Sequence, residues 1–143
     1  MKRTVLYTIL LGIVMLFAAS CKKEVVFSRD QLIGTWKQES YTKRDINHWP
    51  SVDLNADDGY GNTTYSFSLD GVLVMIYSKY ENSYPFSFDE KEKTLAITLQ
   101  DGTIRTWTID NLTDKELVMH RIGRTVGCSP DDYLFKKSFS RVR

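Results

Sequence analysis

Residues 64–77 read TYSFSLDGVLVMIY, and this stretch decides the fold class. Before the Asp70-Gly71 pair the side chains alternate, with Tyr65 and Phe67 on one face and small hydroxyl residues on the other. Such alternation is typical of a β-strand that buries one face. An Asp-Gly pair between two apolar runs is among the strongest local signals for a tight hairpin. The stretch therefore predicts two antiparallel strands joined by a short turn.

The same pattern recurs along most of the chain, and a second Asp-Gly pair, Asp101-Gly102, again separates two apolar runs. Eight runs alternate in polarity or are rich in β-branched and aromatic residues: 32–41, 63–69, 72–80, 84–88, 94–99, 103–109, 116–122 and 133–139. Most connections are short and polar, and the one long irregular segment covers residues 44–62. Evenly spaced strands with short turns predict an all-β antiparallel meander, closed as a barrel or folded as a sandwich.

The first 21 residues predict export. Lys2 and Arg3 precede an uncharged apolar run over residues 4–17, and small residues follow it up to Cys21. This order is typical of a signal peptide. The run is shorter than the roughly 20 apolar residues that a transmembrane helix requires. We therefore expect residues 1–20 to be a cleaved signal peptide rather than part of the fold.

The segment that ends at Cys21 resembles the lipobox of bacterial lipoproteins, although Ala18 stands where Leu is usual. The resemblance implies that Cys21 carries a diacylglyceryl thioether and an N-acyl chain such as palmitate, and that residues 21–28 tether the domain of residues 29–143. Several acyl chains anchor a protein stably where one alone is marginal. The residues after Cys21 resemble those of Bacteroidetes-type lipoproteins and lack the Asp that commonly retains lipoproteins at the inner membrane. Outer membrane attachment is therefore expected, on its periplasmic or its surface face.

Composition excludes a nucleic-acid partner. Cleavage after residue 20 leaves 17 of the 19 Lys and Arg residues against 18 acidic residues, and the basic residues are scattered among acids. A nucleic-acid-binding protein usually shows a basic patch or stripe. The chain has two cysteines, so lipidation of Cys21 would leave Cys128 without a partner for an intramolecular disulfide. A lone cysteine of this kind is most often a small buried apolar residue.

Catalytic and metal-binding motifs are missing from the sequence. There is no Gly-x-Ser-x-Gly and no glycine-rich phosphate loop. Adjacent carboxylates such as Asp57 and Asp58 would point in opposite directions on a strand. His48 and His120 are the two histidines, and with one spare cysteine they do not make a convincing transition-metal site. We therefore predict a protein that is not an enzyme, has no catalytic residues, and uses no metal or cofactor.

Residues 32–36, with Leu32, Gly34 and Trp36, resemble the Gly-x-Trp motif that opens the lipocalin barrel. Later residues are similarly spaced to those of the lipocalin-like domains common in Bacteroidetes lipoproteins: Tyr65, Phe67, Asp70, Gly71, Leu95, Ile97, Trp107, Ile109, Leu112 and Leu117. The resemblance covers residues 32–139 and implies an eight-stranded antiparallel up-and-down β-barrel with Trp36 at its closed end. It also implies an Arg from a late strand lying across that Trp, for which Arg121 and Arg124 are the candidates.

The lipocalin resemblance implies that the protein binds or carries a small hydrophobic molecule in the cell envelope. The ligand-binding residues expected on its apolar faces are Trp36, Tyr65, Phe67, Tyr84, Phe86, Phe88, Trp107 and Met119. An eight-stranded barrel is only wide enough to be filled by side chains or to hold one small ligand. The same aromatic residues therefore also fit a solid barrel.

In the solid-barrel alternative the protein is an interaction or inhibitor module whose long loop, residues 44–62, contacts another envelope protein. Trp49 within that loop supports this alternative, because an exposed Trp favours use as an interface. The volume inside the barrel distinguishes the two hypotheses. A void below about 300 Å³ would disfavour a carrier of drug-sized ligands.

Overall fold

The computed structural model describes residues 26–46, 52–53, 63–124 and 132–143. Cys21, His48, Cys128 and the expected signal peptide lie outside the described residues. The described chain contains one short helix and nine strands: α2 (Arg29–Leu32), β1 (Gly34–Asp45), β2 (Val52–Asp53), β3 (Thr64–Phe67), β4 (Val72–Tyr77), β5 (Tyr80–Asp89), β6 (Thr94–Thr98), β7 (Ile104–Leu112), β8 (Glu116–Arg124) and β9 (Asp132–Arg141).

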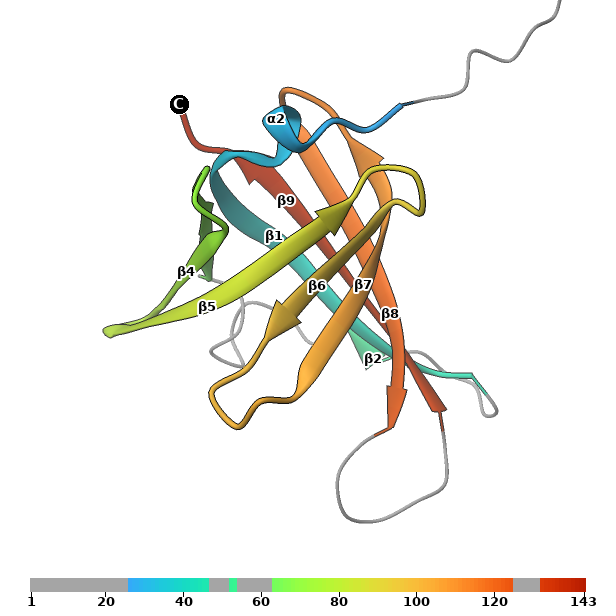
Figure 1. Ribbon diagram of the computed structural model, residues 1–143. Helices are drawn as coiled ribbons and strands as arrows, with labels where there is room; N and C mark the ends of the chain where they lie inside the picture. Colours follow the sequence, from blue (N-terminus) through green and yellow to red (C-terminus); the bar gives the residue numbers. More distant parts are fainter. Residues whose placement is uncertain (1–25, 47–51, 54–62, 125–131) are drawn as a thin grey trace, which may run out of the picture.

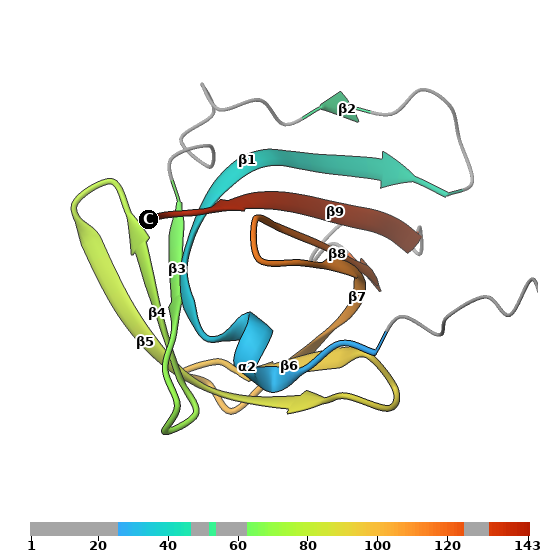
Figure 2. The same cartoon turned by 90° about the horizontal axis from the view of Figure 1, so that it is seen from above.

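Eight of these strands close into an up-and-down barrel (Figures 1 and 2). β1 and β3 to β9 pair in chain order, every pair is antiparallel, and β9 returns to pair with β1. The expected all-β fold and eight-stranded antiparallel barrel are therefore confirmed. Closure removes the unpaired edges that an open sheet would expose.

The long segment expected over residues 44–62 differs in part from that expectation. Arg44 and Asp45 continue β1, because they pair with Leu134 and Tyr133 of β9. The two residues of β2 pair with the outer end of β1 through Lys43 and Thr42. Residues 47–51 and 54–62 lie outside the described residues.

Both Asp-Gly pairs form the expected hairpin turns. The amide of Gly71 donates to the carbonyl of Ser68 (3.2 Å), and that of Gly102 donates to the carbonyl of Leu99 (3.0 Å). Gly71 has a φ of +84°, which a residue without a Cβ adopts at little cost. A three-residue loop with its last residue in this left-handed region is a common hairpin connection. The local signal in residues 64–77 therefore predicts the turn and its strands correctly.

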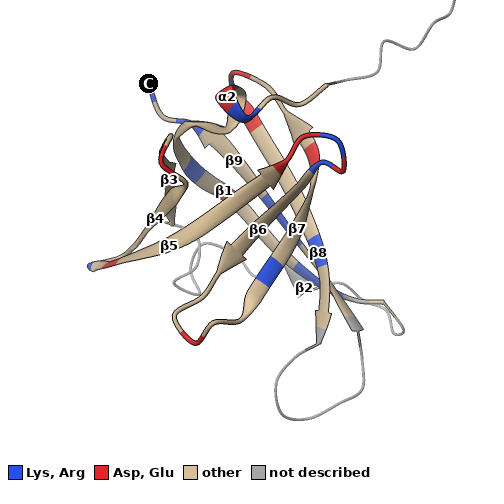
Figure 3. Ribbon diagram, in the orientation of Figure 1, with Lys and Arg blue, Asp and Glu red and all other residues tan. Residues whose placement is uncertain are grey.

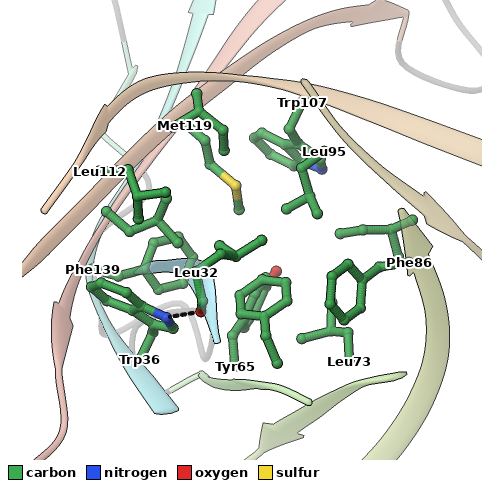
Figure 4. Close-up of a cluster of buried hydrophobic side chains, with 14 of the residues drawn as sticks. Leu32, Trp36, Tyr65, Leu73, Phe86, Leu95, Trp107, Leu112, Met119 and Phe139 are labelled. Atoms are coloured by element: carbon green, nitrogen blue, oxygen red, sulfur yellow. Dashed lines mark hydrogen bonds between the residues drawn. The ribbon is translucent and has the colours of Figure 1, made fainter. Parts of the chain in front are cut away.

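The end of the barrel beside α2 is closed by Trp36 and Arg141. The Trp36 side chain is fully buried, and its Nε1 donates to the carbonyl of Leu32 at 2.8 Å (Figure 4). The Arg141 guanidinium lies 4.3 Å from the centre of the Trp36 ring. Its two terminal nitrogens donate to the carbonyls of Ile33, at 2.9 Å, and Gln31. These contacts join the last strand to the segment that enters the first.

Arg141 therefore takes the place for which Arg121 and Arg124 were the candidates. It lies directly opposite Trp36 in the β1–β9 pairing. Arg121 instead lies over Phe135 and Trp107, and the side chain of Arg124 is outside the described residues. The expectation for Arg121 was wrong because barrel closure, which sets which residue of β9 faces Trp36, is not encoded in local spacing.

Gly34 is required at this closed end. Its φ is +132°, and a Cβ added there would come within 2.7 Å of Nη1 of Arg141. Backbone of this kind is rare for residues other than glycine. The Gly-x-Trp motif thus turns the chain out of α2 and leaves room for the arginine.

Most of the hydrophobic core lies on the α2 side of the barrel interior, where Leu32 packs among side chains of the surrounding strands (Figure 4). Its buried residues come from every barrel strand and from the segment before β1: Phe27, Leu32, Trp36, Tyr65, Phe67, Leu73, Phe86, Leu95, Ile97, Trp107, Ile109, Leu112, Leu117, Met119, Phe135 and Phe139. The Phe67 and Phe86 rings pack edge to face with centres 5.1 Å apart, a preferred arrangement of aromatic rings. Phe27, in the expected tether, is 3% exposed and packs with this core.

Two β-bulges change which residues point into the barrel. The β1–β9 register passes from Gln38 opposite Phe139 to Ser40 opposite Ser138, so Glu39 is an extra residue. A second irregularity lies between Ile109 and Asn111 in β7. A bulge shifts the alternation of side chains by one position. After the bulge in β1 the inward set therefore includes Tyr41.

Candidate ligand-binding site

The barrel contains a cavity of about 290 Å³, lined by residues toward the strand ends away from α2. Residues of all eight barrel strands, or the residues flanking them, line it: Tyr41, Thr63, Tyr65, Met75, Tyr77, Asn82, Tyr84, Ile97, Leu99, Arg105, Trp107, Arg121 and Lys137. The closed half below it is filled by the core, so the cavity is a pocket with a solid floor. Its position follows from barrel closure, because strands distant in sequence meet around one axis.

The cavity has two chemically different walls. Strands β4 to β6 and their flanks contribute mainly apolar and aromatic side chains, namely Met75, Tyr77, Tyr84, Ile97 and Leu99. Strands β7 to β9 contribute Arg105, Trp107, Arg121 and Lys137. The basic positions on β7 and β8 are visible in Figure 3. The cavity is therefore amphipathic across its width.

The strand period places the three basic residues on the inner face. Arg105 is two residues from buried Trp107, Arg121 is two residues from buried Met119, and Lys137 is two residues from buried Phe139: each pair shares one face of its strand. Arg105 is exposed near the mouth, whereas Arg121 and Lys137 are half-buried.

Aromatic rings support the two half-buried cations. The Arg121 guanidinium lies 4.0 Å from the centre of the Phe135 ring and 5.3 Å from that of Trp107. Nζ of Lys137 lies 5.5 Å from the centre of the Trp107 ring and donates to the Tyr65 hydroxyl at 2.7 Å. A cation over a ring gains about 0.5–2 kcal/mol, more as water is excluded. The rings therefore hold these cations toward the cavity without neutralising them.

The cavity has a positive electrostatic character. None of the described residues that line it is Asp or Glu. Burial lowers the pKa of Arg121, and the nearby charge of Arg105 lowers it further, but an arginine stays protonated at neutral pH. Burial raises the pKa of the Tyr65 hydroxyl, against the opposing influence of Arg105 and Arg121, so that hydroxyl stays neutral. The nitrogen Nε of Arg121 is buried without a hydrogen-bond partner among the described residues.

The amino-acid sequence matches a known protein family over most of the barrel. A family model for the lipocalin-like domain matches residues 32–119. The chain belongs to this lipocalin-like family. The match includes Trp36 and Arg105 and ends before Arg121, Lys137 and Arg141. The cations of β8 and β9 therefore belong to the part of the barrel beyond the family match.

A search of the curated proteins finds no match to this lipocalin-like chain. Among solved structures it is similar to the crystal structure of a mutant of LTBP1 in complex with leukotriene C4. The two are 15% identical with a TM-score of 0.43, over 84% of this chain and 75% of that chain.

The lipocalin-like barrel separates the expected ligand-binding residues into two groups. Tyr65, Tyr84 and Trp107 line the cavity. The others lie outside its lining: Trp36, Phe67, Phe86 and Met119 are buried in the core of the closed half, and Phe88 packs against that core.

The three cations and Tyr41 were not among the site residues predicted from the sequence. The alternation of side chains could have indicated Arg105, Arg121 and Lys137 as inward-facing. Each lies two residues from a strongly apolar residue of the same predicted strand. Tyr41 gives no such signal, since the bulge in β1 changes the alternation before it.

The cavity volume lies just under the threshold of about 300 Å³ set for a carrier of drug-sized ligands. The lipocalin-like barrel is therefore neither solid throughout nor roomy enough to enclose a drug-sized molecule. It suits a smaller ligand, or one end of a larger one. Most of the long loop named in the alternative hypothesis lies outside the described residues.

Other site types are not found in the described part of the chain. No group of three or more His, Cys, Asp or Glu side chains there could hold a metal ion. No helix in the same ranges is long and apolar enough to cross a membrane. His120 lies outside the cavity lining, and its Nδ1 is 2.8 Å from Oδ1 of Asp110.

Proposed function

We propose that this protein binds or carries one small, largely apolar molecule in the barrel cavity. The observation that supports this function is the cavity itself, which all eight barrel strands surround and aromatic side chains line. Ligand sites are typically concave and mostly apolar, with a few placed polar groups. Tyr65 and Trp107 are 3% and 5% exposed, so a ligand that reaches them is shielded from water.

The size of the cavity limits the ligand. At about 290 Å³ it lies at the lower end of the roughly 300–1,000 Å³ found for ligand pockets. A medium-chain lipid fragment or a single aromatic ring system is of suitable size. Retinoids, haem and bile acids would extend beyond the cavity and are expected to bind more weakly.

The test is a titration of the purified full chain with medium-chain fatty acids, retinoids, haem and bile acids, followed by Trp fluorescence. We expect a saturable one-to-one response to the smallest ligands, with a Kd on the order of 1–100 µM, or about −5.5 to −8.2 kcal/mol. Because Trp107 lines the cavity, Trp107→Phe should remove most of the fluorescence change while calorimetry still detects binding.

The absence of a saturable response to every member of that panel would contradict the proposal. It would favour the alternative of an interaction module that contacts another envelope protein. A fluorescence change that persists unaltered in Trp107→Phe would also contradict it, since the ligand would then lie elsewhere.

We further propose that Cys21 is lipidated and holds the protein at the outer membrane. The support is the basic start, the apolar run of residues 4–17 and the small residues before Cys21. Cys21→Ser should abolish incorporation of labelled palmitate and move the protein from the membrane pellet to the soluble fraction. Cys128→Ser is the matched control and should change neither result. Equal labelling of Cys21→Ser and the unmodified chain would refute lipidation at this residue.

A further inference from the structure

We infer that the cavity selects small amphipathic anions, with a carboxylate-type head group held by Arg105, Arg121, Lys137 and the Tyr65 hydroxyl. This inference rests on the proposed function and names the chemical class of its ligand. The apolar body of that ligand would lie against the wall formed by β4 to β6.

The three basic residues converge because they lie on consecutive barrel strands at similar height. Lys137 of β9 is paired with Met119 of β8, and Arg121 lies one inward position further along β8 from Met119. Arg121 and Lys137 are thus diagonal neighbours on one inner face, near enough for long side chains to approach one group. The Trp107 ring is within 5.5 Å of both charged groups, 5.3 Å for Arg121 and 5.5 Å for Lys137.

The charged side chains of the described cavity lining are all basic. The described lining contains three cations and no carboxylate. Like charges that are partly removed from water destabilise one another, and an anion placed among them reverses the interaction. The lowered pKa of Arg121, caused first by burial and then by Arg105, agrees with this description.

Hydrogen-bond donors are available as well as charge. Lys137 donates to Tyr65 Oη, and because burial keeps that hydroxyl protonated, its own proton is available to an acceptor. The Nε–H of Arg121 has no partner among the described residues. Charge-assisted hydrogen bonds of this kind are stronger than neutral ones. A carboxylate accepts them with a full negative charge, an alcohol oxygen accepts them without one, and an ammonium group cannot accept them at all.

The opposite wall explains why the anion should also be amphipathic. Met75, Ile97 and Leu99 are apolar, and Tyr84 presents a ring. An inorganic anion would leave this wall in contact with water. A ligand with a short hydrocarbon or aromatic body would remove it from water while its head group remained near Arg105 and Lys137.

The experiment compares ligands that differ only in their head group. Octanoate, 1-octanol and octylamine are titrated into the full chain at pH 7 by calorimetry, with Trp fluorescence as the second measurement. We expect the Kd of octanoate to be at least about tenfold lower than that of octanol, because octanoate brings a full negative charge to these cations and the octanol hydroxyl is neutral. Octylamine, which is protonated at this pH, should show no saturable binding.

Variants then locate the anion site. Lys137→Met and Arg121→Met should each weaken octanoate binding about tenfold and change octanol binding less than about twofold. Lys136→Met is the matched control, because Lys136 is the exposed neighbour on the opposite face of β9, and it should change neither Kd. Arg105→Met, at the exposed mouth, is the variant that leaves the core packing intact. Thermal unfolding of each variant verifies that it is folded.

Three outcomes would overturn the inference. Equal affinity for octanoate and octanol would refute the anion selection and leave the proposed function standing. Equal loss of octanoate binding in Lys136→Met and Lys137→Met would refute the assigned site, since surface charge would then suffice. Binding of neither octanoate nor octanol would overturn the proposed function and the inference with it. The apolar N-terminal run is unchanged in every variant, so ligand uptake there does not alter the comparison.

Discussion

Trp36→Ala is expected to lower the free energy of unfolding by about 3–5 kcal/mol, the usual cost of truncating a buried aromatic side chain. Trp36 is fully buried, donates to the carbonyl of Leu32 and carries the guanidinium of Arg141 on its ring. Its loss would leave a cavity at the closed end and remove the support of that arginine. For a domain of this length the melting temperature should fall by more than about 10 °C. Urea unfolding followed by circular dichroism measures the first effect, and a thermal scan measures the second.

Two control variants test whether the loss of stability comes from the buried Trp36 ring and its hydrogen bond. Ile104→Ala removes an apolar side chain that is 64% exposed, and its effect should stay within about 0.5 kcal/mol. Trp36→Phe keeps a ring but loses the hydrogen bond, which leaves the Leu32 carbonyl unpaired at a cost of about 1–3 kcal/mol. A loss below about 1 kcal/mol for Trp36→Ala would show that the closed end does not depend on this residue.

Trp107→Ala is expected to change both the stability and the ligand preference of the protein. Trp107 is 5% exposed and lies between the core and the cavity, so its truncation should cost about 3–5 kcal/mol. It also enlarges the cavity, which should shift the preferred ligand from octanoate toward longer acids such as dodecanoate. Calorimetric Kd values for acids of increasing length measure the shift, under conditions where the variant is folded.

The matched control for the shift in chain length is Trp107→Phe, which retains most of the ring volume. It should keep the preference of the unmodified chain and lose less stability than Trp107→Ala. If Trp107→Ala is folded but prefers the same chain length as the unmodified chain, Trp107 does not limit the depth of the cavity. That result would place the ligand at the mouth, beside Arg105.

Local pattern was enough to predict the strands and their turns. The alternation in residues 64–69 and the Asp70-Gly71 pair act between neighbours in the chain, and the β3–β4 hairpin forms where they predict it. The role of Trp36 followed from the resemblance of residues 32–36 to a known motif. These features need no information about which distant strand lies beside them.

At the closed end of the barrel, the identity of the covering arginine depends on which distant strands pair. The arginine that covers Trp36 is Arg141, 105 residues away in the chain, and it is opposite Trp36 only because β9 pairs with β1. Arg121, a candidate chosen from earlier in the sequence, was wrong for this role. Pairing of the first and last strands is a property of the closed barrel, so the spacing of residues along one strand does not specify it.

Residue patterns were sufficient to predict the all-β class, the approximate strands and the hairpin turns, and a motif resemblance predicted the Trp at the closed end. The strands and the turns depend on interactions between residues that are near in the chain. Three further features required the folded barrel: Arg105, Arg121 and Lys137 share one cavity, a bulge turns Tyr41 inward, and the void measures about 290 Å³. The physical reason is that a cavity is the small volume left between close-packed side chains, and barrel closure, bulges and packing together set that volume.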